Sequence, residues 1–232
     1  MRLATLAAAA AALLLHAGPA SAVFLDPLAR GFVDDLGAQN GYDPDQNITT
    51  GFLQAVGTLG RTTRSFFVFD VSPLAGRALA SAVLRFEAGE DAGDRRGEFR
   101  VARISGAELA KLAAEAGDGT TFSELGAGDV LASFDLDLAA RDWSGGGFEA
   151  ILPPAAFAGL ASAPGGRWGV GAAFEPASAA SSDQLLFLRS DDQRPGARLS
   201  VTFATEVPLP AAAPALLLGL GALGWAARRR RA

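Results

Sequence analysis

The middle of the chain alternates apolar and polar positions with the period of two that is typical of a β-strand. Ala82, Leu84 and Phe86 fall on one face of the segment 82–87, while the other face holds Val83, Arg85 and Glu87. The aromatic and β-branched run 65–71 also favours a strand. We expect further strands at 98–104, 130–138, 148–152, 167–174, 184–188 and 198–203.

Two short helices interrupt this series of strands. Ser105 is followed three residues later by Glu108, a spacing that predicts a capping box and a helix that ends near Gly117. The segment 154–161 begins with proline and predicts a second helix of one or two turns. Residues 23–62 are rich in glycine, aspartate and asparagine, which indicates loops and short strands.

The pattern as a whole predicts a mainly β fold, a two-layer jelly-roll-like β-sandwich with one or two short helices. The basis is the regular spacing of strands with glycine-rich connections between them. We expect one domain at 23–206, preceded by a signal peptide at 1–22 and followed by a C-terminal sorting signal at 207–232 that includes a transmembrane helix.

The N-terminus has the three parts of a secretory signal peptide. Arg2 supplies the positive region, residues 3–15 form an apolar run, and Ala20 and Ala22 flank a serine in an A-x-A site. We therefore expect signal peptidase to cleave after Ala22. The alternative is a buried N-terminal helix, which would not require such a site.

The C-terminus carries an uncharged segment followed directly by arginines. As a helix, residues 211–227 would extend about 26 Å, close to the ~30 Å hydrocarbon core of a bilayer. Trp225 suits the interface. The positive-inside rule places the tail in the cytoplasm as a stop-transfer signal, and the domain outside. The tail consists of Arg228, Arg229, Arg230 and Arg231.

A proline motif precedes that segment, and the combination resembles a known family of sorting tails. The motif consists of Val207, Pro208, Leu209, Pro210 and Ala211. With the apolar helix and the arginine tail, it resembles the PEP-CTERM class in its VPLPA variant. The resemblance implies a Gram-negative bacterium that makes exopolysaccharide, an exosortase-like membrane protease as partner, and cleavage near the motif. An ordinary permanent anchor is the alternative.

A looser resemblance concerns the domain itself. The segments 64–71 and 81–86 resemble the β-sandwich domains that accompany such tails. This pattern of strands supports the fold more than a function.

Charge and composition exclude several function classes. Residues 23–206 hold all 25 acidic residues and 15 of the 20 basic ones, a net charge of −10, which disfavours nucleic acid as a partner. Cysteine is absent and the single histidine, His16, lies in the signal peptide. A Ser-His-Asp triad, a Cys-His dyad and a typical zinc site are therefore excluded from the mature chain. Carboxylate chemistry, calcium binding through oxygen ligands, or no catalysis remain.

One segment begins like a calcium-binding loop. Asp43, Asp45 and Asn47 have the alternate spacing of its first oxygen ligands. Ile48 and Gln54 stand where the turn glycine and the bidentate glutamate belong, so a polar turn is the preferred interpretation. We expect no cofactor, and calcium is the one candidate.

The two tryptophans of the domain receive different predictions. Trp168 is in phase with Val170 and Ala172 on a strand and is expected in the core. Trp143, beside Asp142 and a glycine run, is the candidate for an exposed ligand contact.

These observations predict a non-enzymatic exported protein, held at the inner membrane and then released to the envelope or the extracellular matrix. A structural or adhesive role with exopolysaccharide is expected there. The alternatives are a carbohydrate-active enzyme that uses paired carboxylates and a calcium-dependent carbohydrate-binding module.

Overall fold

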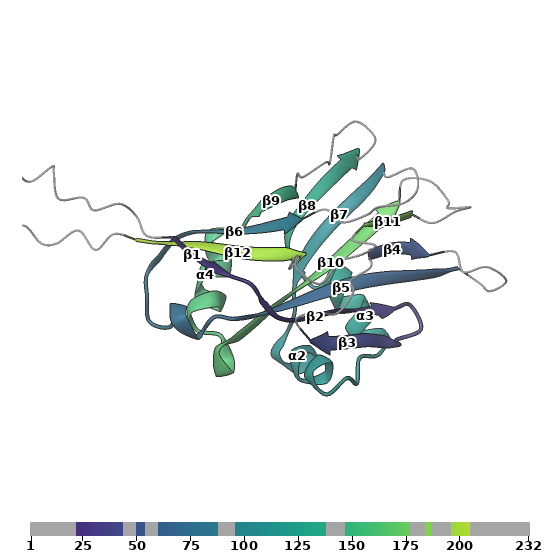
Figure 1. The fold of residues 1–232 in the computed structure, drawn as a ribbon, viewed down its shortest axis with the longest axis horizontal. Coiled ribbons are helices and arrows are strands. Elements are labelled where there is room, and N and C mark those ends of the chain that lie inside the picture. The colour runs from purple at the N-terminus through teal and green to yellow at the C-terminus, as the bar shows by residue number, and fades with distance from the viewer. Residues whose placement is uncertain are drawn as a thin grey trace, which may run out of the picture. The chain divides into compact units, whose positions relative to one another are not determined.

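The computed structural model describes residues 22–43, 50–53, 60–87, 96–137, 147–176, 184–186 and 196–204 (Figure 1). The described residues between Ala22 and Phe203 belong to one compact unit. The predicted signal peptide, except Ala22, and the predicted sorting signal 207–232 lie outside these residues.

Within the described residues, the strands form two antiparallel sheets. The four-stranded sheet has the order β1 (Ala22–Leu25), β12 (Ala197–Phe203), β6 (Leu79–Glu87) and β9 (Gly147–Ile151). The eight-stranded sheet contains β11 (Gln184–Leu186), β4 (Thr50–Leu53), β5 (Arg61–Asp70), β10 (Arg167–Pro176), β7 (Arg96–Arg103) and β8 (Asp129–Asp137), with β2 (Pro27–Asp34) paired to β5 and to β3 (Gln39–Asp43). The expected mainly β, two-sheet fold is confirmed.

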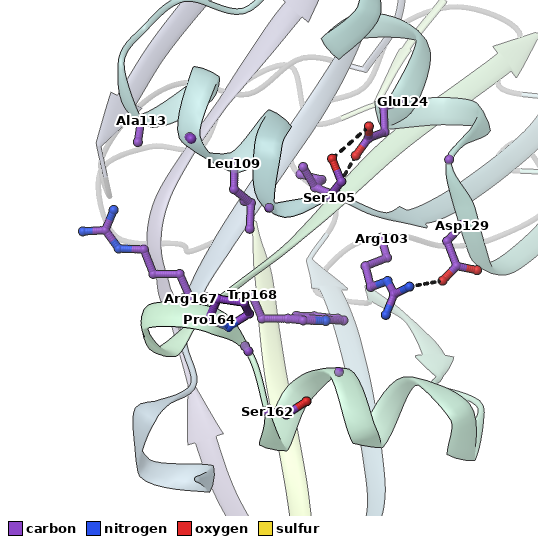
Figure 2. A pocket seen from close by; sticks show the side chains of 16 residues that line it. Arg103, Ser105, Leu109, Ala113, Glu124, Asp129, Ser162, Pro164, Arg167 and Trp168 are labelled. Atoms are coloured by element: carbon purple, nitrogen blue, oxygen red, sulfur yellow. Dashed lines mark hydrogen bonds and ion pairs between the residues drawn. The ribbon is translucent and has the colours of Figure 1, made fainter.

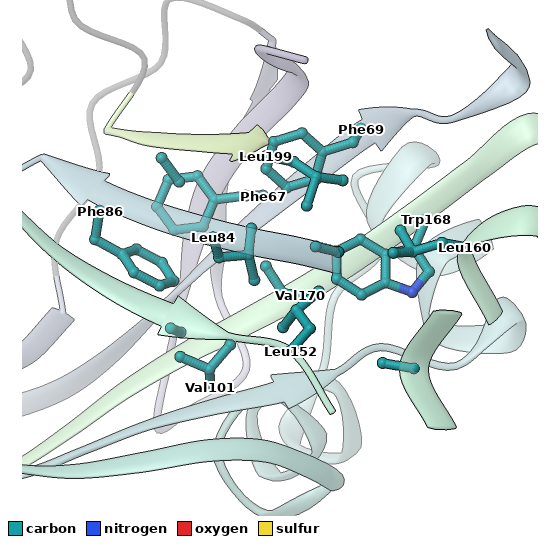
Figure 3. Packing of buried hydrophobic residues seen from close by; sticks show 14 of the residues in the cluster. Phe67, Phe69, Leu84, Phe86, Val101, Leu152, Leu160, Trp168, Val170 and Leu199 are labelled. Atoms are coloured by element: carbon teal, nitrogen blue, oxygen red, sulfur yellow. The ribbon is translucent and has the colours of Figure 1, made fainter. Parts of the chain in front are cut away.

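The core between the sheets is aromatic and aliphatic. Phe67 and Phe69 of β5 lie in one buried cluster with Leu84 and Phe86 of β6 and Leu199 of β12 (Figure 3). The rings of Phe67 and Phe86 meet edge to face with their centroids 5.9 Å apart. Burial of side chains of this size contributes about 1.5–3 kcal/mol each, so this cluster holds the two sheets together.

Strand β5 is buried on both faces, which explains its continuous apolar run. Phe66 and Val68 point away from the sandwich core into a second cluster with Leu112 and Leu125. Those two leucines belong to α2 (Gly106–Ala113) and α3 (Gly119–Ala127), which cover the outer face of the large sheet. A strand covered on both sides needs apolar residues at successive positions rather than at alternate ones.

Helix α3 was missed by the sequence pattern, and the expectation of one or two helices was too low for the described residues. Its start is a capping box in which Asp118 accepts from the Thr121 N–H and the Thr121 hydroxyl accepts from the Asp118 N–H. Thr121 replaces the more familiar glutamate or glutamine of that motif. Helix α4 (Pro154–Ala161) has the predicted bounds, and short 3₁₀ turns lie at Ser72–Leu74 and Pro164–Gly166.

The predicted capping box of α2 forms only in part. Ser105 caps the helix by accepting from the Glu108 N–H at 3.4 Å, as expected. Glu108 does not return the bond, because its carboxylate binds Thr121 Oγ1 and Lys111 Nζ instead. Glu124 of α3 accepts from the Ser105 N–H in its place, so the start of α2 is fixed by a tertiary contact.

Candidate functional site

A cleft of about 850 Å³ lies where α2, α4 and the beginning of β10 approach the end of β7 (Figure 2). Its apolar wall includes Ile104, Leu109 and Pro164. Leu109 packs directly on β10 at Gly169. A side chain at this strand position would not fit, because its Cβ would stand 2.5 Å from Leu109 Cδ2. The wall therefore depends on a glycine in the strand.

Trp168 forms the inner end of the cleft and also belongs to the sandwich core. Its side chain is only 3% exposed, which confirms the prediction that it is a core residue. The indole ring packs on Phe69, its register partner on β5, with centroids 6.2 Å apart. The ring contact with Phe69 and the strand pairing of β10 with β5 hold Trp168 against the core.

The indole N–H of Trp168 has no hydrogen-bond partner among the described residues. Within the described segments, the Trp168 Nε1 atom is buried. Leaving a buried donor unsatisfied costs about 1–3 kcal/mol, so most buried indoles have an acceptor.

Gly159 of α4 lies close to the side chains of Arg103 and Trp168. A Cβ at Gly159 would stand 3.1 Å from Arg103 Nη1 and 3.9 Å from Trp168 Nε1. The absence of a side chain at this position lets the Arg103 guanidinium pack closely on α4. Strand β7 supplies Arg103, β10 supplies Trp168 and α4 supplies Gly159.

Two side-chain pairs hold the polar rim of the cleft. Arg103 Nη2 lies 2.7 Å from Asp129 Oδ2, and both side chains are substantially exposed. Ser105 donates through its hydroxyl to Glu124 Oε2 at 3.1 Å. Both carboxylates therefore have specific partners that hold the ends of β7, β8 and the two outer helices in place.

Most predicted site residues lie outside the described part of the chain. These are Ala20, Asp45, Asn47, Trp143, the motif 207–211 and the arginines 228–231. Asp43 ends β3, opposite Arg30 in the strand register, and Ala22 begins β1. Among the described residues there is no group of three carboxylate or histidine side chains suited to a metal ion. The same residues contain no helix long and apolar enough to cross a bilayer.

Sequence reasoning did not find the cleft. The pattern assigned Trp168 to the core correctly but did not ask which acceptor would satisfy its indole N–H. That question was the available signal, because buried tryptophan N–H groups usually have a partner.

The chain matches no known family model, and a search of curated proteins returns no match. The site must therefore be judged on its own geometry. In this geometry the side chains of Arg103 and Trp168 lie beside Gly159 and next to an apolar wall, in a two-sheet mainly β protein.

Proposed function

We propose that the chain is an exported surface protein of the PEP-CTERM type from a Gram-negative bacterium, with a structural or adhesive role. Two sequence signals carry this proposal, a signal peptide that ends at Ala22 and the Pro208–Pro210 motif followed by an apolar segment and four arginines. Its partners would be signal peptidase and an exosortase-like membrane protease.

The pairing of the first and last strands supports processing at both ends. Ala22 is the register partner of Thr202, so the compact unit begins and ends on adjacent antiparallel strands (Figure 1). Cleavage after Ala22 would remove one residue from β1 and leave the pairs from Val23–Val201 to Leu25–Leu199. Cleavage near residue 208 would leave β12 whole.

We also propose that the sandwich is a jelly roll. The order β1-β12-β6-β9 in one sheet and the run β5-β10-β7-β8 in the other support it. Apart from the consecutive pair β7 and β8, the successive strands of this set alternate between the two sheets, as in that topology. On this proposal β2, β3, β4 and β11 are additions to the eight core strands.

A role without catalysis agrees with the contacts of the cleft carboxylates. Glu124 is held by Ser105 and Asp129 by Arg103, so each stabilises the fold around the cleft.

The test of export and sorting is the intact mass and membrane fractionation of the protein from its own bacterium. A variant with Pro208→Ala and Pro210→Ala is the comparison. We expect wild type outside the inner membrane without either end, and the variant in the membrane, beginning at Val23 and retaining its tail. Retention of the arginine tail by both proteins in the membrane would identify a permanent anchor and refute sorting.

The adhesive role is tested with the recovered protein and the exopolysaccharide of the same bacterium. Retention on the polysaccharide without release of sugars is the expected result. Release of reducing sugars would establish the carbohydrate-active enzyme instead. Loss of retention with a chelator and recovery with calcium would establish the calcium-dependent module.

A further inference from the structure

We infer that the outer face of the four-stranded sheet lies against the bilayer while the C-terminal tail anchors the chain, with Phe24 and Ile151 at the lipid interface. The inference rests on the proposed export and anchoring, and it adds the lipid surface as a partner of this sheet. Three observations carry it, namely an exposed apolar row across the sheet, balanced charges beside that row, and a short connection from β12 to the apolar segment 211–227.

The apolar row crosses the outer face of the sheet from one edge strand to the other. The register sets Phe24 of β1 opposite Ser200 of β12. Ser200 is opposite Val83 of β6, which is in turn opposite Ile151 of β9. Neighbouring strands lie about 4.8 Å apart, so the row is about 14 Å long. Phe24 is 65% exposed and Ile151 is 75% exposed. Exposed apolar side chains that gather on one face, with Val83 between them, mark an interaction surface.

The charged side chains beside this row balance one another. Arg198 lies 2.7 Å from Asp26, and Arg85 is the register partner of Glu149. Each of the four stands two positions from a member of the row, so they share its face of the sheet. Residues 23–206 as a whole have a net charge of −10, which anionic lipids repel. The face with balanced charge therefore meets less repulsion from a bilayer than the domain as a whole.

A short segment connects this sheet to the proposed membrane anchor. Strand β12 ends at Phe203, and the apolar segment begins at Ala211. At about 3.3–3.6 Å per residue, the connection extends at most about 29 Å. The pairing of β1 with β12 places Phe24 beside the tethered strand. Because a short tether keeps the local concentration of lipid high, a weak contact is enough to hold the sheet on the bilayer.

The size of the face favours lipid over a second copy of the chain. Four strands spaced by about 4.8 Å, the shortest of them β1 with four residues, share a flat area of about 300 Å². A stable dimer buries about 800 Å² on each partner. A lipid surface needs no area of this size, because the tail already holds the chain and the apolar side chains add to it.

The experiment places a fluorophore on the sheet of the anchored chain. The Pro208→Ala, Pro210→Ala chain, with its tail, is recovered from its own bacterium and reconstituted in vesicles of phosphatidylethanolamine and phosphatidylglycerol. Because the sequence contains no cysteine, Ile151→Cys accepts a single environment-sensitive label. Leu36→Cys is the matched control, since Leu36 is 73% exposed and lies in the turn between β2 and β3 of the large sheet. We expect the emission of the label at 151 to shift to shorter wavelength and to be quenched by a nitroxide-labelled lipid. The label at 36 should show neither change.

A further substitution tests the apolar row itself. Phe24→Ser should lower the quenching at position 151, because it removes the aromatic side chain of the row from the interface. Leu36→Ser removes an exposed apolar side chain of the other sheet and should leave the quenching at 151 unchanged. Because both side chains are exposed, the melting temperatures of the two variants should stay close to that of the parent chain.

The outcomes separate the docking from the anchor on which it rests. A chain that does not sediment with the vesicles would refute the tail anchor, and the docking with it. A chain that sediments while the labels at 151 and 36 are quenched alike, or not at all, would refute the docking alone. A spectral shift at 151 that is equally large in detergent and disappears on dilution would identify a second copy as the occupant, which also overturns the inference.

Discussion

Arg64 joins helix α3 to the large sheet through Phe122. Its guanidinium carbon lies 4.2 Å from the centroid of the Phe122 ring, and its Nη1 donates to the Phe122 carbonyl oxygen at 2.9 Å. Burial lowers the pKa of Arg64 from its usual value, and the nearby carboxylate of Glu175 opposes that shift. The side chain thus fastens a helix that the sequence pattern did not predict.

We predict that Arg64→Lys lowers the free energy of unfolding by about 1–3 kcal/mol, because lysine loses the planar contact with the ring and the directed bond to the carbonyl. Chemical denaturation measures the change. Arg77→Lys is the control, since Arg77 stacks on Phe203 but is exposed and should cost about 0.5 kcal/mol. Equal losses in the two variants would contradict the role given to Arg64.

Gly171 permits the close approach of α3 to β10. A Cβ at Gly171 would stand 2.4 Å from the backbone oxygen of Leu125, which cannot move aside as a side chain can. Gly171→Ala should therefore destabilise the protein by about 1–3 kcal/mol. Gly106→Ala, where nothing lies within 4 Å, should leave stability unchanged or raise it by up to about 1 kcal/mol. A thermal melt that ranks them in the opposite order would refute the packing argument.

The Thr121 hydroxyl connects the two outer helices. Thr121 is fully buried and donates to the carboxylate of Glu108, which is itself 5% exposed. Thr121→Val should cost about 1–3 kcal/mol, because it removes a partner from a buried carboxylate. Thr120→Val, at the exposed neighbouring position, should change stability by less than about 0.5 kcal/mol. Denaturant midpoints compare the pair, and a similar shift in both would count against the buried bond.

The carboxylate of Asp118 makes the free energy of unfolding depend on pH in the acid range. The Thr121 N–H, and then the Lys111 ammonium, lower the pKa of Asp118 from 3.8 to about 2. The unfolded chain takes up this proton near pH 3.8 and the folded chain only near pH 2. The stabilisation is therefore fully present above about pH 4 and is lost as the pH falls through 2.

We therefore predict that Asp118→Asn melts at a lower temperature than wild type at pH 6, and that the difference disappears toward pH 2. Asparagine can still cap the helix, so the variant isolates the charge. Melting curves between pH 6 and pH 2 give the comparison. A difference that stays constant over this range would show that the charge of Asp118 is not its source.

Local pattern was a good guide where one segment carries all the information. The run 65–71 and the alternation at 82–87 predicted β5 and β6, because the order of apolar and polar residues along a strand follows the burial of its two faces. Helix α4 was predicted from the proline at its start. The pattern failed at Glu108, whose partner is Thr121 of another helix rather than the Ser105 N–H.

The sequence by itself determined the positions of most strands and excluded histidine and cysteine chemistry from residues 23–206, because both follow from residue type and period. Only the tertiary structure decided that Arg103, Trp168 and Gly159 meet at one cleft. Their meeting requires the register that sets Val170 opposite Arg103 and the packing of α4 over both strands. Such contacts between distant segments arise when the sheets and helices assemble, and no local spacing encodes them.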